Sequence, residues 1–226
     1  VEIADGMLNA GAKFALNVDE LNSTKISDIF VGLQKLRIKP KDRDSDIITL
    51  GSFLLSGAEV LPFSKEVKIK NISLDEPKAT LVKNSDGSID LANYFSSDKK
   101  IKQPENNQSH EKPWSLALES ISLKKMGLSF NDKSIAPVVE SRVNELNLIV
   151  KNIVLPSEKP LFYDLSLLVN EKLSCSSKGS VKLAESEVDA HLKCADFDVV
   201  HYLPYIDKAA LENLKTYKTQ LNSAVV

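Results

Sequence analysis

Apolar and polar residues alternate along much of the chain, and a two-residue skip interrupts the alternation repeatedly. Val67 and Ile69 stand at alternate positions; two residues are then skipped, and Ile72 and Leu74 continue the alternation. A period of two is typical of a β-strand with one buried face. Because the skip reverses the phase, a strand needs an extra residue, a β-bulge, to keep its apolar side chains on one face. The stretch therefore predicts a bulged strand.

The same spacing, apolar-x-apolar-x-x-apolar-x-apolar, occurs six times, beginning at Val31, Ile48, Val67, Leu116, Leu148 and Leu192. The intervals between these copies are too irregular for a solenoid of equal repeats. Bulges add twist and bend to a strand. We therefore predict a mainly β fold of the α+β class, in which long, bulged antiparallel strands form a strongly curved, groove-like sheet.

The chain divides into two related β halves, residues 1–95 and 114–206. Residues 67–81 align without gaps on residues 116–130, at an offset that places apolar positions over apolar positions. Residues 96–113 between the halves are polar apart from Ile101. Such a composition buries too little surface to order itself, so we expect a mobile loop there. Residues 207–223 have apolar positions at helical spacing, which predicts a C-terminal amphipathic helix packed on the sheet.

Charge and hydropathy narrow the classes of function. The 226 residues carry a net charge of -2, with 29 Lys and Arg against 31 Asp and Glu. This balance gives no electrostatic reason to expect nucleic acid as a partner. No apolar run of about 18 residues or more is present to span a membrane. Because the chain opens at Val1 rather than Met, we expect it to be a piece of a longer protein.

Motifs that would carry catalysis or bind a metal are missing. His110, His191 and His201 have no carboxylate or Cys partner at ligand or triad spacing. Asp42 opens a D-x-D-x-D string, but a calcium loop of the EF-hand type would need Gly at 47 and Glu at 53. The chain has Ile and Phe there. No carboxylate pair suits glycan hydrolysis. We therefore predict a protein that is not an enzyme and has no cofactor.

Cys175 and Cys194 flank a predicted hairpin that turns near Glu185, and the apolar residues around both share the matching parity. Both thiols should thus face the same side on neighbouring strands. A cross-strand disulfide is one interpretation, suited to an oxidising compartment, although cross-strand geometry is often strained. Two small buried thiols are the other.

Three blocks of the chain resemble a known family in their order and spacing. The first is KIKNISLDEPKATLVKNSDGSIDLANYF, an alternating strand, a Pro, a second strand and a D-G turn before a short helical segment. In the second, Phe130 and Asp132 precede a turn containing Pro137. In the third, CADFDVVHYLPYI, an F-D-V string precedes Pro204 and Tyr205. Together, over about residues 60–206, they resemble the DUF748 group of AsmA-like bacterial envelope proteins.

The resemblance implies a location and a role. AsmA-like proteins of Gram-negative bacteria are anchored in the inner membrane with their bulk in the periplasm, and they are related to bridge-like lipid-transfer proteins whose curved sheet forms an apolar groove. It implies a non-enzymatic periplasmic module in lipid transport and outer-membrane biogenesis or maintenance. The implied partners are phospholipid or another acyl lipid, and envelope proteins or further repeats of the same chain.

Candidate groove residues are inward members of the repeated pattern: Leu33, Leu50, Ile69, Leu118 and Val150. Each is equally consistent with ordinary core packing. The alternative function is a structural or protein-interaction scaffold of the envelope, with its apolar face closed and its long loops binding partners. An open apolar face would favour the lipid interpretation, and a filled core would favour the scaffold.

Overall fold

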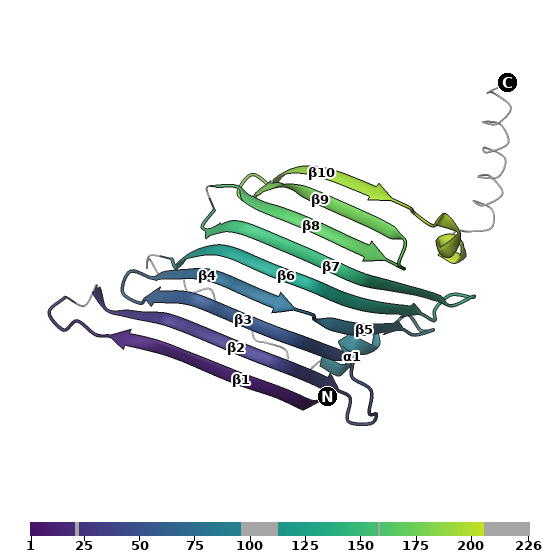
Figure 1. Ribbon diagram of the computed structural model, residues 1–226, viewed down its shortest axis with the longest axis horizontal. Coiled ribbons are helices and arrows are strands. Elements are labelled where there is room, and N and C mark those ends of the chain that lie inside the picture. Colours follow the sequence, from purple (N-terminus) through teal and green to yellow (C-terminus); the bar gives the residue numbers. More distant parts are fainter. Residues whose placement is uncertain (21–22, 96–112, 158, 206–226) are drawn as a thin grey trace, which may run out of the picture.

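The chain forms one large β-sheet in the computed structural model, which describes residues 1–20, 23–95, 113–157 and 159–205 (Figure 1). Most of the predicted polar loop and the predicted C-terminal helix lie outside the described residues. The elements are β1 (Glu2–Ala15), β2 (Lys25–Lys39), β3 (Ile48–Leu61), β4 (Glu66–Asp75), β5 (Lys78–Lys83), α1 (Asp90–Phe95), β6 (Ser115–Asp132), β7 (Val139–Leu155), β8 (Leu161–Val169), β9 (Leu173–Lys182), β10 (Glu187–Ala195) and the 3-10 helix η2 (Val199–Tyr205).

The sheet has ten strands in the order β1-β2-β3-β4-β6-β7-β8-β9-β10, and β5 pairs with β3 and β6. The predicted mainly β fold with long, bulged strands is confirmed. One difference from the prediction is that β4 and β5 pair with β6 in parallel, whereas all other neighbours are antiparallel. Parallel neighbours need a crossover connection. The chain makes this crossover after β5, through α1 and the segment that leads to β6.

The parallel ladder has the same offset as the internal sequence repeat. Val67 pairs with Leu116, Leu74 with Leu123, and Leu81 with Phe130, so each residue lies beside the residue with which it aligns. Parallel strands in register place equivalent positions side by side, and the skips therefore match across the junction.

The junction between the halves is also matched in backbone geometry. Glu76 and Lys125 occupy equivalent positions, and both have a φ of 51°, in the left-handed region. Lys125 Nζ lies 3.4 Å from Glu76 Oε1. The two halves thus meet at corresponding kinks.

Five of the six sequence skips fall on two lines that cross the sheet. On the first line, Leu33 pairs with Phe53 and Leu36 with Leu50, so the skips of β2 and β3 lie side by side. Lys35, inside the skip of β2, has a φ of 54°. The register between β1 and β2 shifts at this level, between Asp5 and Met7. Here the predicted bulge is confirmed.

The second line includes the skip of β4, and there the predicted extra residue is absent. Ile69, Leu118 and Ile153 are ladder neighbours on one side of this skip, and the ladder continues in the same register at Ile72. No extra residue is needed, because adjacent strands reverse their phase together. On β7, Asn152 has a left-handed backbone with a φ of 61°, and this contributes to the reversal of the side-chain alternation. A local pattern cannot show that neighbouring strands share a kink.

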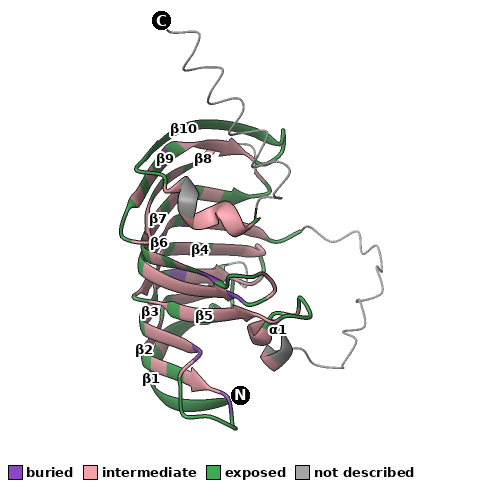
Figure 2. Cartoon of the chain, turned by 90° about the vertical axis from the view of Figure 1, so that its right-hand side faces the viewer, coloured by how far each residue is buried: buried purple, intermediate pink, exposed green. Residues whose placement is uncertain are grey.

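The sheet curves so that both of its edges, β1 and β10, bend toward the same side (Figure 2). Helix α1 lies on that side and contacts β5. Twist and aligned kinks both contribute to such curvature. Among the described residues, no helix has the length and apolar character needed to cross a membrane.

Candidate ligand-binding face

Rows of apolar residues cross the whole sheet on one face. Directly paired residues of neighbouring strands point to the same side of a sheet, so the ladder register assigns each residue to a face. One row consists of Leu8, Leu33, Phe53, Leu74, Leu123, Leu148, Leu165, Ser177 and Leu192. The next row consists of Ala10, Val31, Leu55, Ile72, Ile121, Val150, Tyr163, Gly179 and Ala190. Each row has one residue with a polar side chain.

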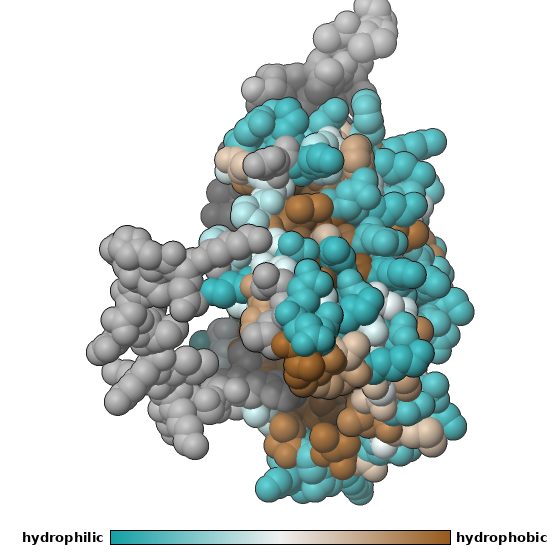
Figure 3. Space-filling model, turned by 90° about the vertical axis from the view of Figure 1, so that its left-hand side faces the viewer, coloured by the Kyte–Doolittle hydropathy of each residue, from teal (hydrophilic) through white to brown (hydrophobic). Residues whose placement is uncertain are grey.

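A third row beyond the first line of skips is apolar throughout: Ile3, Ile38, Ile48, Ala79, Leu128, Val143, Val169 and Leu173. Viewed from the end of the sheet, hydrophobic side chains gather toward the inside of the curve and hydrophilic ones line its outside (Figure 3). We call the face that carries these rows the inner face, and the opposite one the outer face.

The five candidate groove residues all take ladder positions in this pattern. Leu33 is in the first row and Val150 in the second, whereas Leu50 pairs with Leu36 between the first and third rows. Ile69 pairs with Leu118 at the second line of skips. Leu118 is 5% exposed, and the other four are half-buried. The structure therefore brings the five into one apolar pattern rather than into one pocket.

The inner face is open where the structure describes the chain. Among the described residues, the buried apolar ones are Ile47, Ala58, Leu118 and Val139. A sheet covered by a second layer would bury far more. At the edges the first row is largely exposed, with Leu8 at 69% and Leu192 at 73%. The arrangement is an extended apolar surface that curvature shelters only in part.

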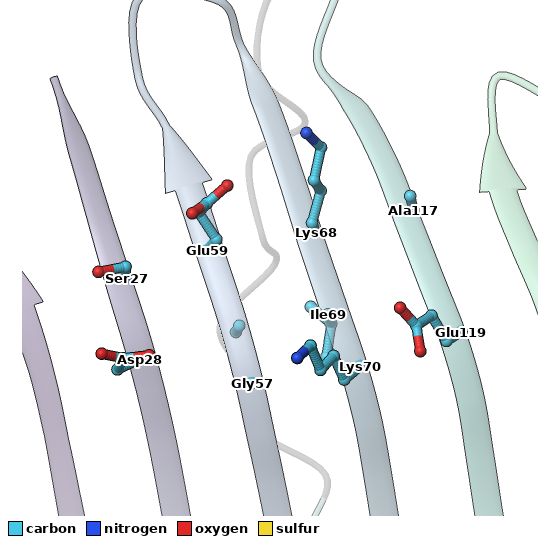
Figure 4. A pocket seen from close by; sticks show the side chains of 10 residues that line it. Ser27, Asp28, Gly57, Glu59, Lys68, Ile69, Lys70, Ala117 and Glu119 are labelled. Atoms are coloured by element: carbon cyan, nitrogen blue, oxygen red, sulfur yellow. The ribbon is translucent and has the colours of Figure 1, made fainter. Parts of the chain in front are cut away.

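The outer face has a different chemistry, and Figure 4 shows a hollow on it between β2 and β6. Side chains of both charges line this hollow, including Asp28, Glu59, Lys68, Lys70 and Glu119. Several belong to ion pairs with exposed partners, such as Asp28 with Lys13 at 2.8 Å and Glu59 with Lys25 at 3.5 Å. These opposed charges form a solvated, balanced surface.

A buried carboxylate, Asp132, lies at the end of β6 on the inner face. Its side chain accepts hydrogen bonds from the Ser134 hydroxyl at 2.6 Å, the Ser134 backbone N–H at 2.9 Å and the Tyr205 hydroxyl at 3.0 Å. Lys83 Nζ lies 3.4 Å away, on the paired strand β5. The carboxylate thus connects β5, β6 and η2.

These contacts stabilise the ionised form of Asp132. The Ser134 hydroxyl, the largest contributor, and the other donors lower the pKa of Asp132 to about 2 against the opposing effect of burial. Burial, together with the neighbouring Asp132 carboxylate, raises the pKa of the Tyr205 phenol. Ser134, Tyr205 and Lys83 all direct their polar atoms to the Asp132 carboxylate. The cluster is therefore suited to holding η2 on the sheet rather than to proton transfer.

The two cysteines lie directly opposite each other on β9 and β10, and they form a disulfide with an S–S distance of 2.05 Å. Cys175 pairs with Leu167, and Leu167 pairs with Leu146, so the disulfide belongs to the inner face. His201 lies in η2, where its Nε2 is 3.4 Å from the Ser141 hydroxyl. Within the described parts of the chain, no three His, Cys, Asp or Glu side chains are grouped to hold a metal.

Sequence reasoning missed two side-chain clusters. The Asp132–Tyr205 contact joins residues 73 positions apart, and its members had appeared only as parts of two separate family-like blocks. The Tyr163 and Ser177 hydroxyls lie 3.0 Å apart on β8 and β9. Tyr163 and Ser177 follow the alternating pattern of their strands. The only signal in the sequence was therefore a polar residue at an inward position.

Compared with known proteins, the chain matches no family model, and no curated protein matches it significantly.

Proposed function

We propose that this protein is a non-enzymatic module that binds acyl lipid on the inner face of its sheet. The observation that carries the proposal is the continuity of the apolar rows from β1 to β10 on an open, curved face. Large exposed apolar surfaces of soluble proteins mark binding sites for other molecules or membranes. The hollow on the outer face is lined by side chains of both charges, so the two faces differ as a lipid-binding surface requires.

The dimensions and energetics suit acyl chains. A row that crosses nine strands spans eight gaps of about 4.8 Å, which is about 38 Å. One leaflet contributes only about 15 Å of hydrocarbon to a bilayer, so a row is long enough for two chains end to end. Burying each CH₂ contributes about 0.8 kcal/mol. Binding of this kind needs apolar area and no catalytic group.

The resemblance to AsmA-like proteins supports a more specific setting. In this proposal the module belongs to a longer periplasmic protein anchored in the inner membrane, which takes part in lipid transport and maintenance of the outer membrane. The disulfide supports an oxidising compartment such as the periplasm. The order of the three family-like blocks supports the family itself.

Mass spectrometry of lipids extracted from protein purified without detergent tests the proposal. We expect phospholipid or another acyl lipid to co-purify in stoichiometric amounts. Leu8→Lys places a charge on the exposed edge of the inner face and should reduce the bound lipid. Asn9→Lys, one residue along β1 on the outer face, is the matched control and should leave lipid unchanged. A lipid-free wild-type protein would reject the proposal.

A scaffold that binds other proteins is the second candidate function. The specific observation in its favour is that β1 and β10 end the sheet with no further strand beside them in the described part of the chain. Unpaired strand edges are templates for pairing with another chain. If lipid is absent and the purified chain elutes as a larger assembly in size-exclusion chromatography with light scattering, this function replaces the first.

A further inference from the structure

Two hydroxyl groups interrupt the apolar inner face near its C-terminal edge. The Tyr163 hydroxyl lies 3.0 Å from the Ser177 hydroxyl, and either atom is able to donate the hydrogen bond. Ser177 is 8% exposed. On the inner face, Tyr163 has Val150 and Gly179 as ladder neighbours, and Ser177 has Leu165 and Leu192. The pair is thus a small polar spot surrounded by apolar and small residues.

The pair has one hydrogen more than its mutual bond uses. Two hydroxyls carry two hydrogens and four lone pairs, and the hydrogen bond between them uses one hydrogen and one lone pair. One O–H therefore remains to donate. Among the described residues, neither oxygen makes another hydrogen bond. The remaining O–H depends on water or on a ligand, and a polar group that loses its water must find another partner.

The residues around the pair on the inner face are small on one side and apolar on the other. Gly179 and Ala190 follow Tyr163 in the same row, and a Cβ at Gly179 would collide with the backbone oxygen of Asp189, so β10 packs closely against β9 there. On the other side, the first two rows from β7 to β1 hold only apolar residues. A molecule that covers this face would therefore meet hydrogen-bonding groups at one end and hydrocarbon along the rest.

We infer that Tyr163 and Ser177 form a polar anchor that donates a hydrogen bond to the carbonyl oxygen of an acyl lipid, whose chain extends over β7 toward β1. An alkyl chain laid over the pair would remove water and supply no acceptor. An ester or carboxylate oxygen would replace the water. The inference rests on the proposed lipid binding and adds the class of ligand, a lipid with an acyl carbonyl, and the position of that carbonyl.

Competition between three ligands of equal chain length tests the anchor. Decane, methyl decanoate and decanoate each displace a fluorescent apolar dye from the purified chain. The readout is the affinity for each carbonyl ligand divided by that for decane. In the Tyr163→Phe/Ser177→Ala variant this ratio should fall about 2- to 10-fold, the range of a single hydrogen bond. Ser176→Ala, which removes a hydroxyl from the outer face of β9, should leave the ratio unchanged.

A spectroscopic measurement separates hydrogen bonding from a change in packing. The carbonyl stretch of ¹³C-labelled methyl decanoate should move to lower frequency on binding to the wild type and not on binding to the variant. Ser177→Ala alone serves if the double variant does not fold. If the affinity ratio falls for only one of the two carbonyl ligands, the anchor binds that kind of carbonyl, the ester or the carboxylate. If it falls for both, the anchor binds the carbonyl oxygen that they share.

The outcomes distinguish this inference from the proposed function. Equal ratios in wild type and variant, with binding of all three ligands retained, would overturn the anchor and leave lipid binding intact. Failure of the wild type to bind any of the three would overturn both.

Discussion

The two halves of the sheet share the alternation of apolar and polar residues and differ in the chemistry of the inner face. In the first half, from β1 to β5, the two central rows contain only aliphatic residues and Phe53. In the second half the same rows include Tyr163 and Ser177, and a neighbouring row ends in the Cys175–Cys194 disulfide. Strand pattern therefore determines which face is apolar, and individual residues determine what that face recognises.

The ends of the halves show the same contrast. Two six-residue segments are similar in sequence: Asp90-Leu-Ala-Asn-Tyr94-Phe, which forms α1, and Asp198-Val-Val-His-Tyr202-Leu, which leads into η2. The Tyr94 hydroxyl accepts a hydrogen bond from Arg43, whose guanidinium also lies 5.5 Å from the ring centre. Tyr202 instead stacks on Phe197, with ring centres 5.7 Å apart. The segment is repeated, but the contacts that hold it are not.

The largest effect is expected when a charge is placed on the inner face, and placing it in either half compares the two halves. Leu118→Asp places a carboxylate where the side chain is 5% exposed, and Ile69→Asp places one at its half-buried ladder partner in the first half. Leu118→Asp should cost about 3 kcal/mol or more of unfolding free energy, because its buried charge is unpaired, and Ile69→Asp should cost less because water reaches its side chain. Urea denaturation measures this. Lys124→Asp, on the exposed outer face of β6, is the control and should cost little.

The disulfide should stabilise only the second half. β10 has β9 as its neighbour, and the two cysteines are 19 residues apart. Cross-links that close loops of about this length contribute about 3 kcal/mol in the chain-entropy account. The Cys175→Ser/Cys194→Ser variant should therefore lose hydrogen-exchange protection in β9 and β10 first. Equal loss of protection across β1 to β4 would show that the halves do not respond separately.

The Asp132 cluster should make part of the stability dependent on pH. Because folding lowers the pKa of Asp132 from 3.8 to about 2, its contribution is fully present above about pH 4 and disappears as the pH falls through 2. The difference in unfolding free energy between wild type and Asp132→Asn should follow this course. Tyr205→Phe removes one of the donors and should give a smaller difference. A difference that is constant from pH 2 to 6 would contradict the assignment.

The smallest effect is expected where the two halves meet at the surface. Lys125 and Glu76 are 62% and 52% exposed, and such ion pairs contribute about 0.5 kcal/mol or less. A double-mutant cycle with Lys125→Ala and Glu76→Ala should give a coupling energy in this range that decreases in 0.5 M NaCl. A coupling above about 1 kcal/mol would mean that the parallel junction depends on this pair.

The sequence by itself determined the strands, their apolar face and the offset between the halves. Alternation is a local property, and it holds whatever partner the strand has. The offset predicted a repeat, and the matching parity of Cys175 and Cys194 placed their side chains on one face. The five candidate groove residues follow from the same rule.

Only the tertiary structure decided how the strands and side chains combine. The parallel pairing of β4 with β6 is not visible in the local pattern, because either strand direction has the same period of two. The absence of an extra residue at Ile69 depends on neighbours that kink together. Asp132 with Tyr205, and Tyr163 with Ser177, meet across separate segments. Such contacts arise from long-range register, which no single stretch of the chain contains.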